Sequence, residues 1–282
     1  MAKAQRTFER RQLGLAVKRL RARLGVSQQV AADAIGRSRS RIVEVEDGTG
    51  TLSVEDLATL LDYFRVSGEE RETMVALGVQ ARRRRRRQPY VDALPNSYQR
   101  FADLEASASR IDIIEPGLMP GLLQTRDYML ALAEEAEGVL LTGADDRIAF
   151  RMDRQAMIFG TDEPREVRIV LTEEALRADL GQPKVMRAQL EHVLDLERPG
   201  LDIRVVRRNI RGNPLRGRAL VLFGFGDRAP AVGYSEAVLG PSTYYDDEAD
   251  TAMLARAFDR VWGLALAESS AKRFIRDVLE EL

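Results

Sequence analysis

The sequence predicts an α N-terminal domain of five helices, residues 1–88, and an α/β C-terminal domain, residues 89–282, whose small sheet is flanked by helices. Two patterns predict these classes. Apolar residues recur at helical spacing in the first third of the chain, and later β-branched runs alternate with helical segments. Six arginines, Arg82–Arg87, end at Gln88-Pro89, where proline stops a helix, so we place the boundary there.

The N-terminal helices carry their own start and stop signals. Gly25 ends the first amphipathic stretch, and Ser27 and Ser38 are suited to capping the second and third helices. Ser53 and Asp56 have the spacing of a capping box, which recurs before the fifth helix. The expected helices cover about 9–24, 28–34 and 39–46, and two more begin after Ser53 and Ser67.

The rest of the chain mixes helices and strands. Ile111–Thr125 contains two Pro/Gly pairs, so we expect an ordered turn rather than a regular element. Later runs are β-branched or alternate with period two, as strands do. We expect helices at about 98–108, 126–135, 144–159, 183–197, 247–265 and 268–281, and strands at 167–171, 201–206, 220–225 and 231–234.

Composition excludes several classes of function. The 282 residues include no cysteine and one histidine, His192, which excludes a disulfide framework, a cysteine nucleophile and thiolate metal sites. No phosphate-binding loop, nucleophile elbow or metal-ligand cluster occurs, so we expect no enzyme, no cofactor and no metal. We also find no signal peptide and no run of about 18 apolar residues, which predicts a cytoplasmic protein without membrane contact.

The net charge of −1 hides a division between the two parts. Residues 1–88 hold 19 Lys and Arg against 11 Asp and Glu, a net charge of +8, whereas residues 89–282 hold 24 against 33, a net charge of −9. A basic part joined to an acidic part indicates a polyanion partner. The arginine run fits a solvated helix end, a contact with DNA phosphates or a contact with the acidic domain.

The second and third expected helices, joined by a short turn, form a helix-turn-helix. In this motif the second helix enters the major groove and its N-terminal side chains meet base edges. Ile42 and Val45 are spaced to pack inward, which turns Arg39, Ser40, Val43 and Glu44 toward the groove. Arginine makes the bidentate contact with guanine, so we assign direct readout to Arg39.

The neighbouring polar residues are assigned weaker roles. Ser40 can contact base or phosphate, and Glu44 either accepts from cytosine N4 or is a surface acid. Arg37 and Arg41 suit phosphates, and Gln28 stands where a helix N-terminus meets a phosphate. The candidate DNA-binding residues are Gln28, Arg37, Ser38, Arg39, Ser40, Arg41 and Glu44.

Five features of the second part each allow two interpretations. Pro116–Tyr128 fits a binding surface or a connector packed on the sheet, and Arg154-Gln155 fits a pocket lining or a helix surface. His192 fits a half-buried helix position or a catalytic or ligand role, and Trp262 fits a core face or a ligand cage. Tyr244-Tyr245, before three acids, fits a site for a basic partner or a loop leading into a helix.

Many positions between residues 10 and 66 follow one pattern at fixed spacing. They are Leu13-Gly14, Leu20-Arg21, Gly25–Gln28, Ala31-Ala32, Ile35-Gly36, Ser38–Ser40, Ile42, Glu46 and Gly48. In this pattern the N-terminal part resembles the xenobiotic-response-element (XRE), or Cro/C1-type, helix-turn-helix regulators, and the resemblance implies a dimer that binds DNA through its third helix. At Val43–Val45 and Thr49–Thr51 the sequence departs from the common pattern, which affects the phosphate contact expected after the recognition helix.

The second part also contains a series of matching segments. They are Leu104-Glu105, Glu115-Pro116, Met119–Thr125, Tyr128, Arg154-Gln155, Glu173–Leu176 and Met186–Leu190. In these segments the chain resembles actinobacterial regulators that include the WhiJ-like proteins. These regulators carry an XRE head and a C-terminal domain of unassigned function, and many are encoded beside a very small partner protein in an antitoxin-like arrangement. The resemblance implies a ligand or a small protein partner for the C-terminal domain.

These observations favour a dimeric, sequence-specific transcriptional regulator with a double-stranded DNA operator, of repressor or antitoxin-like type. In this hypothesis the C-terminal domain senses a ligand or a small protein encoded nearby. The alternative is an interaction module that sequesters such a partner, with DNA binding serving autoregulation. Recovery of a partner from the native cell distinguishes the two hypotheses.

Overall fold

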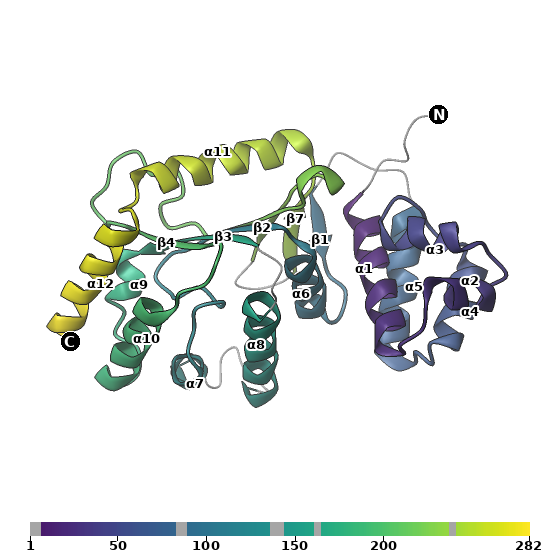
Figure 1. The fold of residues 1–282 in the computed structure, drawn as a ribbon, viewed down its shortest axis with the longest axis horizontal. Coiled ribbons are helices and arrows are strands. Elements are labelled where there is room, and N and C mark those ends of the chain that lie inside the picture. Colours follow the sequence, from purple (N-terminus) through teal and green to yellow (C-terminus); the bar gives the residue numbers. More distant parts are fainter. Residues whose placement is uncertain (1–6, 83–88, 136–143, 161–164, 237–240) are drawn as a thin grey trace. The chain divides into compact units, whose positions relative to one another are not determined.

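The computed structural model describes residues 7–82, 89–135, 144–160, 165–236 and 241–282 (Figure 1). Contacts divide the chain into two compact units, residues 1–107 with 227–250 and residues 108–226 with 251–282. The helical N-terminal region and a following region with a seven-stranded mixed sheet and flanking helices confirm the predicted fold class. The arginines after Arg82 lie outside the described residues, and the domain boundary after Gln88 stays a prediction.

The five expected N-terminal helices are present in the first unit. Each of the first four begins at a polar N-cap, and the Thr7, Ser27 and Ser53 side chains accept a backbone N–H there. Ser38 takes the N-cap position of the third helix but makes no such bond. The helices are α1 (Phe8–Arg23), α2 (Gln28–Ala34), α3 (Arg39–Glu46), α4 (Val54–Tyr63) and α5 (Gly68–Arg82).

One hydrophobic core joins these helices. Leu13 and Leu20 of α1, Ile42 of α3 and Leu60 and Leu61 of α4 are all fully buried. Full burial of one such side chain stabilises the fold by about 1.5–3 kcal/mol. The core therefore fixes α3 against α1 and α4, which is what a rigid recognition helix requires.

The first unit also contains β1 (Tyr90–Asp92), α6 (Ser97–Ser107), β6 (Val232–Ser235) and β7 (Ser242–Tyr245). β7 pairs antiparallel with β1 and with β6. Phe8 of α1 stacks on Tyr244 with ring centroids 4.4 Å apart and lies 4.6 Å from Tyr90. The loop expected at Tyr244-Tyr245 is wrong: these residues form β7, where Tyr244 is fully buried among aromatic rings.

A buried ion pair ties α6 to β1. The Arg100 guanidinium donates to both carboxylate oxygens of Asp92, at 2.8 and 2.5 Å, and both side chains are almost inaccessible. The same guanidinium donates to the backbone carbonyls of Leu94 and Pro95. A buried pair with its remaining donors satisfied in this way holds a fixed geometry.

The second unit is built on four strands in the order β5-β2-β3-β4. The strands β2 (Arg110–Glu115), β3 (Glu166–Thr172) and β4 (Leu201–Val206) run parallel, and β5 (Leu220–Gly224) pairs antiparallel with β2. The ordered turn expected over Ile111–Thr125 is therefore wrong in its first third. Four consecutive residues of β2 are buried, as in a strand covered on both faces, and the Pro/Gly pairs begin only after it.

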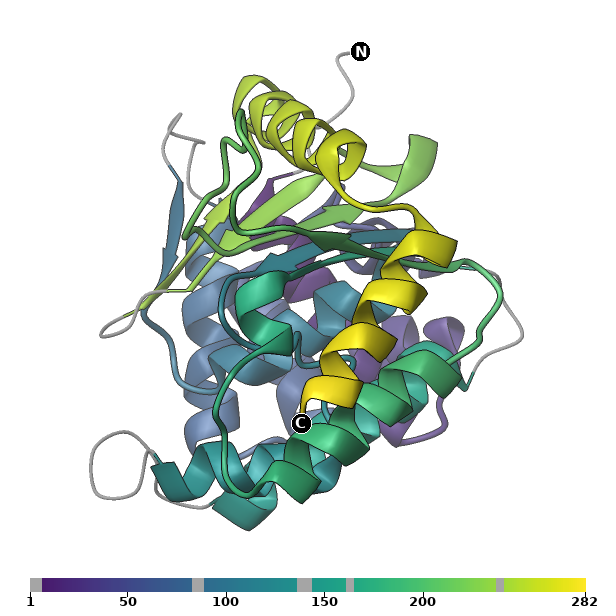
Figure 2. The ribbon, with the colours of Figure 1, turned by 90° about the vertical axis from the view of Figure 1, so that its left-hand side faces the viewer.

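Helices cover both faces of these strands (Figures 1 and 2). The face under α11 carries Ile114, Val170 and Val206, which pack against Phe258 and Val261. The α12 helix packs against β4 and against α10. The helices of this unit are α7 (Arg126–Glu135), α8 (Ala144–Phe159), α9 (Glu173–Leu176), α10 (Pro183–Asp195), α11 (Glu248–Leu264) and α12 (Glu268–Glu281).

The segment Pro116–Tyr128 is a packed connector. Tyr128 is fully buried, and its hydroxyl accepts the backbone N–H of Met119 at 3.1 Å. The Gln155 amide donates to the carbonyls of Gly121 and Gln124, at 2.8 and 2.9 Å. The connector interpretation is confirmed, and Gln155 has a role that the sequence did not indicate, since it fixes this connector.

Trp262 lies on a core face, as the first of its two interpretations predicts. It is half-buried and packs beside the cluster under α11, with its ring stacked on Phe258 at 5.9 Å between centroids. The Arg204 guanidinium lies 4.1 Å from the centroid of one ring of the indole. Packing and a cation–π contact thus account for this side chain.

His192 is half-buried on α10, and burial lowers the pKa of its imidazole below the ordinary 6.5, although Asp195 opposes this shift. The unfolded chain then binds the proton more readily, so the free energy of unfolding should fall as pH drops below 6.5. NMR titration of this single histidine should give a pKa below 6.5. His192→Gln should remove this part of the pH dependence, and a midpoint above 6.5 would contradict the burial argument.

Candidate nucleic-acid interface

The recognition helix α3 is seated on α1 through its apolar side and its backbone. Ile42 and Val45 are fully buried, as their spacing predicts. Gly14 of α1 lies so close to α3 that a Cβ there would stand 2.2 Å from the carbonyl oxygen of Val45 and 2.8 Å from that of Glu46. The identity of Gly14 therefore sets the distance between the two helices.

The turn between α2 and α3 is closed by backbone hydrogen bonds. Ala32 and Asp33 near the end of α2 accept the N–H groups of Arg37 and Gly36, at 3.0 and 3.1 Å. Gly36 has a φ of 63°, a conformation that glycine adopts without strain. The turn places the start of α3 in solvent, where Ser38, Arg39 and Ser40 are exposed.

A buried carboxylate, Glu46, connects three helices at the base of this surface. Arg21 of α1 donates to both of its oxygens, at 2.5 and 3.0 Å, and Gln28 of α2 donates to one of them at 2.8 Å. The hydrogen bond with Glu46 raises the pKa of Arg21. The Gln28 oxygen in turn accepts from Arg39 at 3.3 Å. Gln28 and Arg39, two of the predicted DNA-binding residues, are thus brought together.

The sequence did not indicate this role of Arg21 and Glu46. The two residues are 25 positions apart, and no local periodicity connects them. Only the packing of α1 against α3 brings them into contact. The available signal was that Arg21 and Glu46 are both among the positions that match the helix-turn-helix pattern.

Arg37 has a different partner. Its guanidinium donates twice to Asp56 of α4, at 3.1 and 3.3 Å, while remaining half exposed. Burial alone would raise the pKa of Asp56, but the hydrogen bonds from Arg37 and Ser53 outweigh it, and the pKa lies below its ordinary value. Arg37 must exchange this carboxylate for a phosphate if it contacts DNA.

The remaining predicted residues pair along α3. The hydroxyls of Ser38 and Ser40 are 2.8 Å apart, and Arg41 donates to Glu44 at 3.2 Å. Exposed pairs of this kind contribute about 0–1 kcal/mol and exchange readily for other partners. The candidate surface is therefore an exposed polar row, held from below by the Glu46 network.

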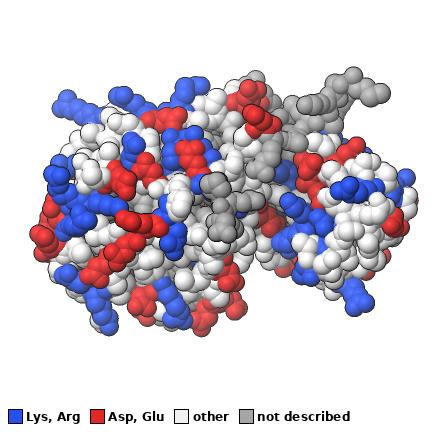
Figure 3. Space-filling view, in the orientation of Figure 1, with Lys and Arg blue, Asp and Glu red and all other residues white. Residues whose placement is uncertain are grey.

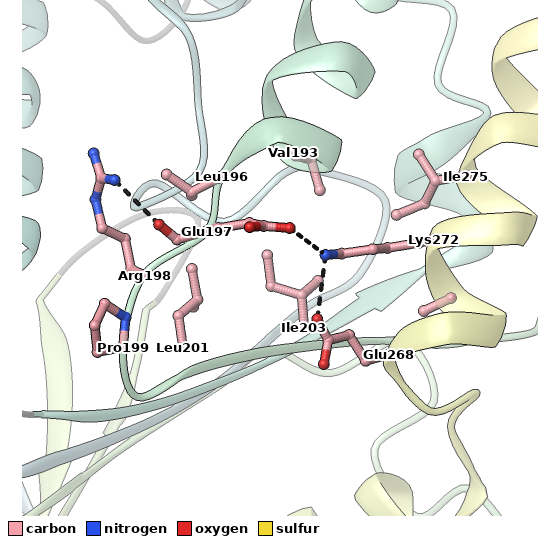
Figure 4. A pocket seen from close by; sticks show the side chains of 11 residues that line it. Val193, Leu196, Glu197, Arg198, Pro199, Leu201, Ile203, Glu268, Lys272 and Ile275 are labelled. Carbon is pink, nitrogen blue, oxygen red and sulfur yellow. Dashed lines mark hydrogen bonds and ion pairs between the residues drawn. The ribbon is translucent and has the colours of Figure 1, made fainter.

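The second unit contains a pocket of about 450 Å³ between α10, β4 and α12 (Figure 4). Its lining includes the apolar side chains of Val193, Ile203 and Ile275. Lys272, which also lines the pocket, donates to Glu197 at 3.1 Å and to Glu268 at 3.2 Å, and these bonds raise the pKa of Lys272. The volume lies within the range of small-molecule sites.

None of the helices in the described ranges has the length and apolar character needed to cross a membrane. No group of three His, Asp or Glu side chains in those ranges is placed to hold a metal ion.

Comparison with known proteins gives two family matches. A model described as a domain of unknown function, DUF5753, matches residues 98–277, and a helix-turn-helix domain model matches residues 12–74. No curated protein matches the chain.

One solved structure that matches this chain is that of TrmBL2, described as an archaeal chromatin protein with a novel mode of DNA binding. It is 13% identical, with a TM-score of 0.31, over 76% of this chain and 66% of that one. The chain thus spans slightly less than two thirds of that protein, and so low a score does not indicate a shared fold. Because the DUF5753 match spans more than half of the sequence, the chain belongs to the DUF5753 family, and it carries an XRE-like helix-turn-helix domain ahead of the family domain.

Proposed function

We propose that this protein is a sequence-specific DNA-binding transcriptional regulator whose α3 helix enters the major groove. The observation that carries the proposal is the exposed row at the start of α3, Ser38–Ser40, on a base fixed by the buried Glu46. Rigid presentation of a few polar side chains is what base readout by a helix-turn-helix requires. The matching helix-turn-helix model supports the same function.

The proposal includes a dimer that binds two half-sites about one helical turn apart. It places the chain among repressor or antitoxin-like regulators of the WhiJ-like type, acting in the cytoplasm. It assigns no catalytic step to the chain.

Arg39→Ala is expected to weaken binding to the operator by about 1–3 kcal/mol and to relax the preference at one base position. The reason is the loss of one bidentate contact, since Arg39 is exposed and hydrogen-bonds only with Gln28 among the residues that the structure describes. The measurement is the affinity of the full-length chain for operators that vary one base pair at a time.

Arg41→Ala serves as the matched variant on the same helix. Arg41 pairs with Glu44 at the surface and is assigned to a phosphate contact. Its loss should therefore weaken binding to all DNA sequences alike and reduce the dependence of affinity on salt. Unchanged affinity and base preference in Arg39→Ala would show that readout lies elsewhere.

We further propose that the C-terminal domain receives the signal, from a ligand or from a small protein partner. The pocket beside Lys272 supports a ligand as the signal, because its lining combines apolar side chains with charged groups. Purification of the full-length chain from its native cell tests the partner form. Recovery of a stoichiometric small protein would support it, whereas operator binding with no such protein would contradict it.

A further inference from the structure

The connection between β4 and β5, residues 207–219, is the most basic described segment of the second unit. It carries a net charge of +5, although residues 89–282 together carry −9. Figure 3 shows basic side chains along the upper left, where Figure 1 places this connection and α11. Its charged residues are Arg207, Arg208, Arg211, Arg216 and Arg218, and we refer to the segment as the arginine loop.

The arginine loop has a fixed shape. Leu215 is buried in the cluster under α11. The Arg216 guanidinium donates to the backbone carbonyls of Arg208, at 3.0 Å, and Ile210. The Arg208 N–H donates at 3.2 Å to the buried carboxylate of Glu173. Ordered connections of about a dozen residues without regular structure are uncommon, and most of them are functional.

Three guanidinium groups remain available on its surface. Arg211 and Arg218 are exposed, and within the described part of the chain neither side chain has a hydrogen bond or ion pair. Arg260 of α11 is exposed too and lies beside the loop, with its Nη2 atom 3.2 Å from where a Cβ on Gly212 would stand. Within the described part of the chain, none of these three guanidinium groups has a neutralising partner.

We propose that the arginine loop and Arg260 form a second DNA-binding surface, which contacts phosphates irrespective of sequence. The inference rests on the proposed function, since it takes DNA as the polyanion. Every cation of the loop is an arginine, whose planar fork pairs with phosphate oxygens.

The exposed side chains of the arginine loop favour DNA, rather than an acidic protein, as its partner. Protein interfaces have cores that are rich in aromatic and apolar side chains and poor in charge. None of the exposed large hydrophobic side chains of the described residues lies between 207 and 219. A surface of this kind suits the polyelectrolyte contact, in which cations displace counterions from the duplex.

The test is the salt dependence of binding of the full-length chain to a random-sequence duplex of about 30 base pairs, roughly three helical turns. We compare the wild type with the triple variant Arg211→Gln, Arg218→Gln, Arg260→Gln. The control variant Lys184→Gln, Arg187→Gln, Arg276→Gln removes the same charge from exposed positions on α10 and α12. Thermal unfolding checks that all three chains fold.

The loop variant should weaken binding at low salt by about tenfold or more and reduce the log–log salt slope by about 2–3, since each phosphate contact contributes about 0.9. The control variant should change the log–log salt slope by less than about 0.9, the contribution of one phosphate contact. Equal slopes in both variants would overturn the proposal, as would a loop variant that loses self-association while keeping its slope. Because this assay uses no operator, it can contradict the proposed role of the arginine loop while operator recognition through Arg39 is still observed, and the reverse is equally possible.

Discussion

Gly14→Ala should destabilise the first unit by about 3 kcal/mol or more and abolish specific DNA binding. The added methyl would stand 2.2 Å from the Val45 carbonyl oxygen, so the backbone of α3 must move away from α1. Overpacking in a core usually costs about 1–3 kcal/mol, and a clash with backbone lies at the upper end because no side chain can rotate away. Chemical denaturation and operator titration measure the two effects.

Gly263→Ala provides the control for this substitution. Gly263 lies in α11, and a Cβ there meets no atom within 4 Å. Because alanine is the better helix former, this variant should gain up to about 1 kcal/mol. If Gly14→Ala unfolds within about 0.5 kcal/mol of the wild type, the close approach of α1 and α3 is not a constraint.

Glu46→Ala should cost about 3–5 kcal/mol, the range for removing one partner of a buried ion pair. The Glu46 carboxylate is only 3% exposed and Arg21 only 16%, so the substitution leaves a guanidinium in a largely buried position. It also removes the acceptor that fixes Gln28. Stability and operator affinity should therefore fall together.

Glu44→Ala is the matched variant, because Glu44 lies on the same helix, two residues before Glu46, but is exposed. Its carboxylate is 52% exposed and pairs with Arg41 at the surface, so we expect a change in stability of about 0–1 kcal/mol. Similar losses in Glu44→Ala and Glu46→Ala would contradict the buried network. Removal of Arg21 together with Glu46 should recover part of the loss, because no unpaired charge then remains.

The sequence predicted the helices well because their signals are local. The second and third helices have the predicted bounds, since the Ser27 cap and the glycines after each helix act within a turn of it. The outward position of Arg39 and the burial of Ile42 follow from the 3.6-residue period alone.

The sequence-based predictions were wrong or incomplete where contacts between distant parts of the chain determine the structure. β2 was missed because the Pro/Gly pairs after Glu115 dominated the interpretation of a run whose strand character comes from pairing with β3 and β5. β1 and β7 have three and four residues, and they are strands because β7 pairs with both β1 and β6. The Arg37–Asp56 pair joins the turn before α3 to α4, and the Glu46 network joins three helices; no local pattern indicates either contact.

The claim that the start of α3 reads bases in a dimeric complex is tested most directly by selection of duplexes from a random pool with the full-length protein. We expect a dyad-symmetric site with half-sites about one helical turn apart. We also expect Arg39→Ala to select the same site with the preference lost at one symmetric pair of positions. Enrichment of no sequence by the wild type, or of the same full site by Arg39→Ala, would contradict it.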